Sequence, residues 1–206
     1  MSNYLVRTMK EIQTEELIIK TAKHIFFFKG NFQATTQDIA DAAGVNRALI
    51  HYYFRTREQL MEAVLKAGML KMNERIFNIT QLNVSFREKI KHFITAIIDE
   101  ARETPYLENF VVHEFNRLDL SCVPYPNKEY IQETFSGFIN QILDEMKNGS
   151  IPEIDPIHFI INMVALCVYP ISTRPLIQRT FMIDDAAYNI FIEEQKEIIY
   201  KLIFRE

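Results

Sequence analysis

The sequence predicts an all-α protein made of two helical parts. Apolar residues recur at three- and four-residue spacing along most of the chain, which is the period of a helix with one buried face. Helix start and stop signals separate these stretches, and no stretch alternates apolar and polar residues as a half-buried strand does. A chain of 206 residues, of which 48% are hydrophobic and 24% charged, has enough apolar material for one or two compact domains.

The first predicted helix runs from Thr14, which can cap it, to Gly30, which can end it. Glu15 and Glu16 suit its first turn, because carboxylates are favoured at a helix N-terminus. Its apolar stripe consists of Ile18, Ala22, Ile25 and Phe26. We expect this stripe to be buried.

Residues 35–57 predict two short helices joined by a glycine turn. The first helix begins at Thr35, because Thr35 and Asp38 have the spacing of a capping box. It ends before Gly44, where a residue without Cβ can take the left-handed conformation at no steric cost. With the helix that precedes it, this pair would form a three-helix domain.

The second helix of the pair begins at Asn46. Ile50 and Phe54 lie four residues apart on one face and are expected to pack inward. The opposite face carries Arg47, Ala48, His51 and Tyr52. That face suits a DNA major groove, because Arg can bond guanine edges, Ala can contact a thymine methyl, and His and Tyr reach phosphates or bases. The alternative is an ordinary αα-hairpin whose aromatic residues belong to a core.

The order of residues here resembles the DNA-binding domain of the tetracycline-repressor (TetR/AcrR) family. The shared features are Thr-Thr, Ile-Ala, Ala-Gly-Val, a polar-basic pair, Tyr-Tyr-Phe, and an ending at Arg57, Glu58 and Leu60. The resemblance covers about Thr14 to Leu65. It implies a DNA interface made of Thr36, Gln37, Asn46, Arg47, Ala48, His51, Tyr52, Tyr53 and Arg57.

Within this interface the resemblance implies different roles for different residues. Thr36 and Gln37 would contact the DNA backbone, Tyr53 would meet phosphate, and Arg57 takes the place of a phosphate-contacting lysine. His51 stands where the family often has tyrosine, and Ala48 where it often has glycine or proline. The resemblance therefore does not identify the bases that are read.

The distribution of charge supports a nucleic-acid partner at the N-terminal end. Residues 1–57 contain 8 Lys or Arg and 5 Asp or Glu, a net charge of +3, which leaves −7 for residues 58–206 out of the total of −4. An excess of +3 is modest, so tight binding would need two such domains side by side. This favours a dimer.

The remainder of the chain is also predicted to be helical. Helices are expected at residues 57–79, from Ser85 to just before Pro105, at 106–117, at 128–147, from Asp155-Pro156 onward, and from about 184 to 204, with a loop at 121–127. Residues 1–57 would form a helix-turn-helix DNA-binding domain, and residues 58–206 a helical ligand-binding and dimerisation domain. The apolar stretch 157–171 is shorter than the roughly 20 residues of a membrane span, and we expect a buried helix there.

The last helix predicts a dimer interface. A seam at alternating three- and four-residue spacing, widened by neighbouring isoleucines, comprises Tyr188, Phe191, Ile192, Gln195, Ile198, Ile199 and Leu202. The alternative is that the core of a single chain buries the whole surface. In the family resembled, the last two helices pair with their symmetry mates as a four-helix bundle, which favours a homodimer.

The sequence contains no catalytic constellation, so we expect no enzyme, no cofactor and no metal. The histidines of the predicted helices occur singly, and there is neither a glycine-rich phosphate loop nor a nucleophile elbow. Cys122 and Cys167 support neither a disulfide framework nor a zinc site, and a redox pair stays open. Residues 1–10 lack the apolar core of an export signal, so a cytoplasmic protein without a membrane partner is expected.

Aromatic residues and methionine in the middle helices could line a ligand cavity. The candidates are Phe93, Tyr106, Phe110, His113, Phe135, Phe138 and Met163. Such residues more often simply fill a core. The resemblance to a family of ligand-responsive repressors implies a pocket somewhere in this domain.

These observations predict a dimeric one-component transcription factor, a repressor that releases a near-palindromic DNA operator when a small, largely apolar effector binds. The change in DNA affinity would come from the different affinity of the effector for two conformations. One alternative is a DNA-bound adaptor whose acidic C-terminal domain docks a protein partner without a ligand. An enzyme is a weaker alternative.

Overall fold

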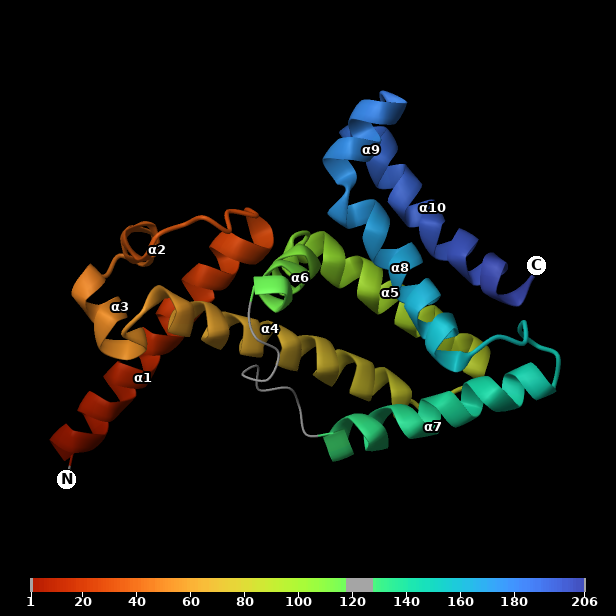
Figure 1. Ribbon diagram of the computed structural model, residues 1–206, viewed down its shortest axis with the longest axis horizontal. Coiled ribbons are helices and arrows are strands. Elements are labelled where there is room, and N and C mark those ends of the chain that lie inside the picture. The colour runs from red at the N-terminus through yellow and green to blue at the C-terminus, as the bar shows by residue number, and fades with distance from the viewer. Residues whose placement is uncertain (1, 118–127, 206) are drawn as a thin grey trace. The chain divides into compact units, whose positions relative to one another are not determined.

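The computed structural model describes residues 2–117 and 128–205, and its regular elements there are all helical (Figure 1). In chain order these elements are α1 (Ser2–Lys23), the π-helix η1 (His24–Phe28), α2 (Thr36–Ala43), α3 (Arg47–Phe54), α4 (Arg57–Thr80), α5 (Phe86–Glu103), α6 (Leu107–Arg117), α7 (Lys128–Lys147), α8 (Pro156–Ser172), α9 (Arg174–Phe181) and α10 (Asp185–Phe204). The predicted all-α fold is confirmed. The loop predicted at residues 121–127 lies outside the described residues.

The chain divides into two compact units. Unit 1 comprises residues 1–70 and 106–124, and unit 2 comprises residues 71–105 and 125–206. Helix α4 contributes residues to both units. Because α6 and the first part of α4 belong to unit 1, this unit is larger than the N-terminal domain of residues 1–57 that the sequence suggested.

Unit 1 begins with a helix longer than expected. Helix α1 starts at Ser2, so Thr14 lies inside it and does not cap it, and that prediction is wrong. No glycine or proline separates Ser2 from Thr14, so nothing in the sequence breaks the helix before this point. The C-terminal part widens into the π-helix η1, where the Lys29 N–H donates to the His24 carbonyl at 3.2 Å.

Aromatic side chains form the core of unit 1 where α6 packs on η1. Phe26 and Phe110 are fully buried and stack with their ring centroids 5.1 Å apart. The Tyr106 N–H donates to the Phe27 carbonyl at 2.9 Å. Gly30 has φ +66°, and a Cβ there would lie 2.9 Å from the Tyr106 ring, so this turn needs glycine for both conformation and space.

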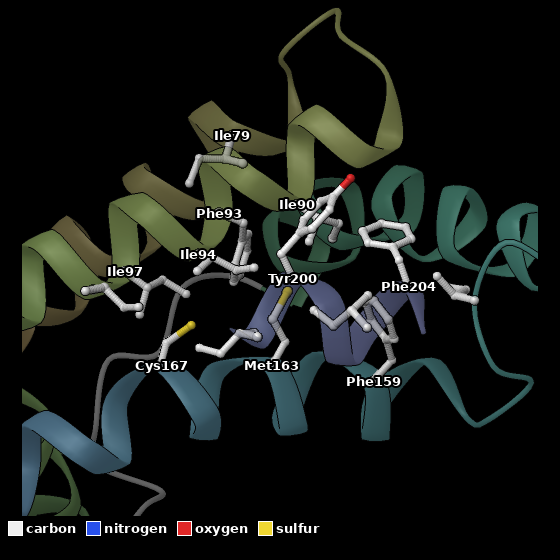
Figure 2. Close-up of a cluster of buried hydrophobic side chains, with 14 of the residues drawn as sticks. Ile79, Ile90, Phe93, Ile94, Ile97, Phe159, Met163, Cys167, Tyr200 and Phe204 are labelled. Carbon is white, nitrogen blue, oxygen red and sulfur yellow. The ribbon is translucent and has the colours of Figure 1, made fainter. Parts of the chain in front are cut away.

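The core of unit 2 lies between α5, α8 and α10. Figure 2 shows Phe159, Met163 and Cys167 pointing from α8 toward the apolar face of α5, with Tyr200 and Phe204 of α10 beside them. The α5 side chains in this core are Phe86, Ile90, Phe93, Ile94, Ile97, Ile98 and Ala101. Each large side chain buried here stabilises the fold by about 1.5–3 kcal/mol relative to exposure.

Helix α8 begins where the sequence predicted, because the Asp155 carboxylate accepts from the Ile157 N–H at 2.7 Å and Pro156 occupies the first turn. The expectation that this helix is buried is wrong for one of its faces. Ile157 is 59% exposed and Ile161 is 57% exposed, whereas Phe159 is buried. Apolar composition alone does not reveal how much of a helix its own chain covers.

Helix α9 was not predicted. It spans only 8 residues, and none of its side chains is buried. Its geometry is maintained by polar contacts, since the Arg174 guanidinium donates to Asp185 at 2.7 Å and the Gln178 amide donates to the same carboxylate at 2.8 Å. At 8 residues the helix is shorter than the stretch over which helical periodicity can be recognised, which explains why the sequence pattern missed it.

Candidate nucleic-acid interface

Helix α2 has the predicted capping box. The Thr35 hydroxyl oxygen accepts from the Asp38 N–H at 3.2 Å, and the Asp38 carboxylate accepts from the Thr35 N–H at 2.8 Å. Hydrogen bonds from the backbone and then the side chain of Thr35 lower the pKa of Asp38. The cap fixes where α2 begins.

The turn between α2 and α3 also follows the prediction. Gly44 has φ +65° and ends α2 in the left-handed conformation. A Cβ at this position would meet no atom within 4 Å, so only the backbone angle demands glycine. Two residues later, the Asn46 side chain accepts from the Ala48 N–H at 2.9 Å and caps α3. Helix-turn-helix geometry is thus specified locally at each of its three joints.

The inner faces of α2 and α3 are apolar and buried. Ile39 and Ala40 of α2 have no exposed surface, and Ile50 and Phe54 of α3 are 1% and 5% exposed. Both inward predictions for α3 are confirmed. Because the inner face of α3 is buried in the core of unit 1, only the opposite face of α3 can contact another molecule.

The outer face of α3 carries the predicted reading residues. Asn46, Arg47, Ala48, His51 and Tyr52 are all exposed, with Tyr52 at 67%. His51 Nδ1 lies 3.0 Å from the Arg55 carbonyl oxygen, which can only accept, so Nδ1 carries the hydrogen in this contact and Nε2 remains for another partner. This surface offers donors, acceptors, one guanidinium and a methyl group on a single helix.

The predicted backbone-contacting residues differ in accessibility. Gln37 is exposed and its amide donates to Asp41 at 2.7 Å, whereas Tyr53 is half-buried with its ring centroid 5.1 Å from that of Tyr52. Thr36 is only 7% exposed, so its side chain belongs mainly to the packing of α2.

Arg57 has a structural role that the sequence did not reveal. Its Nε donates to the Ala34 carbonyl at 3.0 Å, and its Nη2 donates to the Phe32 carbonyl at 2.7 Å. The guanidinium therefore fixes the segment that leads into the cap of α2. A phosphate contact by Arg57 stays a prediction, and it would have to coexist with these two hydrogen bonds.

The seven predicted effector-binding residues are divided between the two units. Tyr106, Phe110 and His113 belong to unit 1, where Phe110 packs against the aromatic side chains of η1. The other four, which belong to unit 2, are Phe93, Phe135, Phe138 and Met163. The Phe93 and Phe138 rings stack with centroids 5.9 Å apart and fill the core. An effector site at these seven residues stays a prediction.

Two cavities in unit 2 were not anticipated. One, of about 450 Å³, is lined by Lys71, Glu74, Arg75, Asn78, Ile79, Glu100 and Glu103 of α4 and α5. A smaller apolar one, of about 150 Å³, lies between α8 and α10 and includes Met163 and Leu202. A polar stripe at residues 71, 74, 75 and 78, which have helical spacing, was the sequence signal for the first.

The predicted dimer residues of α10 fall into two groups. Tyr188, Ile192 and Ile199 are 3%, 1% and 0% exposed within unit 2, so the core of the chain itself accounts for them and their assignment to an interface is corrected. The remaining four are more accessible: Phe191 and Gln195 are half-buried, Ile198 is 45% exposed and Leu202 is 60% exposed.

Three further features of the described residues concern metal ligands, the cysteines and membrane-spanning length. No group of three or more His, Cys, Asp or Glu side chains is placed to hold a metal ion in the described part of the chain. Burial raises the pKa of the Cys167 thiol to about 12, which disfavours the reactive thiolate, and Cys122 lies outside the described residues. In the described ranges no single helix is long and apolar enough to cross a membrane, although α8 and α9, bent by 70°, pass together by length and composition.

Comparison with known proteins supports the interpretation of α2 and α3. Residues 18–64 match the family described as bacterial regulatory proteins, tetR family. The chain is 25% identical over 146 residues to the uncharacterized HTH-type transcriptional regulator YhgD of Bacillus subtilis, covering 70% of this chain and 75% of that protein. It is 23% identical over 158 residues to the HTH-type transcriptional regulator TtgR of Pseudomonas putida, covering 72% and 74%.

Solved structures share the fold over nearly the whole chain. The hemolysin II transcriptional regulator HlyIIR has a TM-score of 0.59 at 22% identity, covering 94% of this chain and 98% of that one. AibR in complex with isovaleryl coenzyme A and operator DNA has a TM-score of 0.64 at 15% identity, covering 93% and 98%. The family match falls on the helices whose caps, turn and exposed face were described above. The family match on residues 18–64 and the similar regulators support a TetR-family DNA-binding transcriptional regulator.

Proposed function

We propose that this regulator is a repressor that binds a near-palindromic operator as a homodimer and releases it when a small effector binds unit 2. The observation that carries the proposal is the outer face of α3, where Asn46, Arg47, Ala48, His51 and Tyr52 are exposed on a helix whose other face is buried. A major groove admits such a helix. The basic excess of residues 1–57 favours the same end of the chain.

In the proposed complex the residues of α3 and its neighbours make different kinds of contact with the DNA. Arg47 in the first turn of α3 would bond a base edge, and Ala48 would contact a thymine methyl. His51 and Tyr52 would reach bases or phosphates, while Gln37 and Tyr53 would position the domain on the DNA backbone. Thr36 would act through its backbone N–H at the helix start, since its side chain is buried.

Exposed apolar side chains on α8 and α10 support the homodimer. Ile157 and Ile161 of α8, and Ile198 and Leu202 of α10, are each 45% exposed or more, and the Gln195 amide donates to the Leu166 carbonyl at 3.3 Å between these two helices. A large exposed apolar surface on neighbouring helices more often marks a protein interface than a surface that stays in contact with solvent. A second copy would cover it with the same surface.

Effector release would follow from linkage. A molecule that binds one conformation of the dimer more tightly must lower operator affinity if that conformation spaces the two α3 helices wrongly. AibR, which has this fold, was solved with both isovaleryl coenzyme A and operator DNA. That precedent supports an effector for this chain without identifying the molecule.

The adaptor alternative has one observation in its favour. Helix α9 has no buried residue; Phe181, its last residue, is 69% exposed, and Met182 directly after it is 92% exposed. A protein partner could cover them. Release of bound DNA by a small molecule in the absence of any other protein would favour the repressor. DNA binding that changes only when a partner protein is added would favour the adaptor.

In vitro selection of DNA by the purified protein tests the proposal. We expect a near-palindrome whose half-sites are about 34 to 36 Å apart, or a multiple of that, because a two-fold dimer presents two identical α3 helices. Selection that returns only a single asymmetric half-site would contradict the dimer, and selection without any sequence preference would contradict operator recognition.

A further inference from the structure

The C-terminal end of α3 is a strained turn that involves His51. Helix α3 ends at Phe54, and Arg55 directly after it has φ +50° and ψ −49°. A residue with a Cβ rarely takes a positive φ, so neighbouring contacts must hold Arg55 in place. Two hydrogen bonds do this: the Arg55 N–H donates to the His51 carbonyl at 3.0 Å, and His51 Nδ1 lies 3.0 Å from the Arg55 carbonyl oxygen.

This turn determines which nitrogen of the His51 ring carries the hydrogen. A backbone carbonyl can only accept, so Nδ1 must donate to Arg55. An uncharged imidazole has a single N–H, and Nε2 is then left with a lone pair. His51 is exposed on the outer face of α3. The group that it offers to DNA is therefore a hydrogen-bond acceptor.

An acceptor at this position restricts the possible partners on DNA. Phosphate oxygens only accept hydrogen bonds, so the uncharged imidazole cannot bond them. In the major groove, guanine presents N7 and O6 and thymine presents O4, which are acceptors as well. The donors there are the exocyclic amines, N6 of adenine and N4 of cytosine.

We propose that His51 is a specificity-determining residue whose Nε2 accepts a hydrogen bond from an adenine N6 or cytosine N4 amine of the operator. The inference rests on the proposed function, because it names the base chemistry that α3 reads in its second turn. Exchange of the preferred pair for its transition partner, A·T for G·C or C·G for T·A, would place a keto oxygen opposite the Nε2 lone pair.

The neighbouring reading residues do not duplicate this role. The Asn46 side-chain oxygen accepts from the Ala48 N–H, so its amide nitrogen is the group left to donate to DNA. The Arg47 guanidinium has donors only. The first turn of α3 thus offers donors, and His51, four residues after Arg47, offers an acceptor. The two turns should therefore select bases with opposite hydrogen-bonding groups.

A purely structural role for His51 has different consequences. If the imidazole only closes the turn at Arg55, its removal should lower stability and weaken binding to every DNA sequence alike. A contact with an amine instead couples one side chain to one base, so the effects of removing the two are not additive. This coupling is the quantity to measure.

The protonated nitrogen can be identified on the wild-type protein without DNA. A long-range ¹H–¹⁵N NMR spectrum at about pH 8, where free histidine is neutral, separates the two ring nitrogens. The protein has five histidines, and His51→Phe identifies the signals of His51. We expect hydrogen on Nδ1 and none on Nε2. Hydrogen on Nε2 would overturn the inference, because the ring would then offer a donor.

The base contact is tested on operator DNA selected by the wild-type protein. Comparison with selection by His51→Phe identifies the pair whose preference depends on His51. At this pair, purine replaces adenine, or 2-pyrimidinone replaces cytosine, which removes only the amine. Fluorescence anisotropy at about pH 8 should show that wild type loses at least about fivefold in affinity, whereas His51→Phe should lose far less.

His24→Phe is the matched control. His24 is another exposed histidine of unit 1, it lies outside α2 and α3, and its ring stacks on Phe28 with the centroids 5.1 Å apart. This variant should keep the wild-type loss on removal of the amine. Circular dichroism checks that both variants are folded. Equal losses in wild type and His51→Phe, or no pair whose preference depends on His51, would overturn the inference.

The same experiments separate this inference from the proposed function. A near-palindromic operator that a small molecule releases, but whose preferred bases do not depend on His51, overturns the inference and leaves the repressor intact. Coupling between His51 and an amine on DNA that no small molecule releases supports the inference and contradicts effector release. Binding without any sequence preference contradicts both.

Discussion

At the scale of single residues, the structure separates the two arginines of the predicted interface. Arg47 is exposed in the first turn of α3, on the face that points away from the buried Ile50 and Phe54. Arg57 is half-buried and donates to the Phe32 and Ala34 carbonyls. A guanidinium that donates to backbone carbonyls contributes to the stability of the fold. Substitution of Arg57 should therefore change stability, whereas substitution of Arg47 should change DNA binding.

Arg47→Ala should weaken binding to the selected operator by about 1 to 3 kcal/mol and relax the base preference next to it, because a bidentate contact to a base would be lost. Fluorescence anisotropy with the operator and with single-base variants measures both effects. Circular dichroism must show that the variant is folded. A loss that is equal for every sequence would remove Arg47 from base readout.

Arg57→Ala should lower the free energy of unfolding by about 1 to 3 kcal/mol, since two carbonyls of the segment before α2 lose a charged donor. Arg57→Lys keeps the charge but cannot reproduce the fork of donors, so it should recover only part of the loss. Urea unfolding measures the stability of all three proteins. If Arg57→Lys is as stable as wild type and only DNA binding changes in Arg57→Ala, the phosphate contact is the main role of this side chain.

At the scale of elements, a buried lysine joins α5 to its neighbours. Lys89 is 2% exposed, and its ammonium donates to the Thr80 carbonyl at 2.8 Å and to Gln141 Oε1 at 3.0 Å. The first contact satisfies the C-terminal end of α4, where a cation is favoured. Both acceptors are neutral, and burial lowers the pKa of Lys89 below its ordinary 10.5.

This lowered pKa predicts how stability depends on alkaline pH. Between the folded pKa and 10.5 the unfolded chain holds the Lys89 proton longer than the folded chain, so the free energy of unfolding should gain a rising contribution with pH over that window. Below the window the contribution is constant. Lys89→Met should lack the rise, and the difference between the two proteins in urea unfolding from neutral to alkaline pH isolates it. Parallel curves would contradict a buried, desolvated Lys89.

At the scale of the whole molecule, the proposed homodimer would depend on the exposed residues of α10. Leu202→Glu should shift the protein toward monomers, because a charge would be buried without a partner between the subunits. Ile190→Glu is the control, since Ile190 is also 60% exposed but lies on a different face of α10. Operator affinity should fall steeply in Leu202→Glu alone, since a single chain loses the second half-site.

Sedimentation and operator binding on the same sample measure this effect. Ile199→Glu would not be informative about assembly, because Ile199 has no exposed surface and a charge there should unfold unit 2. A folded Leu202→Glu variant that stays dimeric and binds DNA as wild type does would place the dimer elsewhere.

The sequence by itself determined the parts of the protein that depend on local interactions. The capping box of Thr35 and Asp38, the left-handed Gly44 and the Asn46 cap each involve residues within four positions of one another, so their spacing was enough to predict the helix ends and the exposed face of α3. The inward position of Ile50 and Phe54 followed from the helical period.

Only the tertiary structure decided which apolar and charged residues meet across the chain. The periodicity of α10 could not show that Ile199 is covered by its own chain and Leu202 is not, because burial depends on which elements pack against a helix. Nor could it show that Phe93 fills a core, that Arg57 bonds carbonyls more than twenty positions earlier, or that Glu100 meets Arg75. These contacts join residues far apart in sequence, and their energies depend on distances that no local pattern contains.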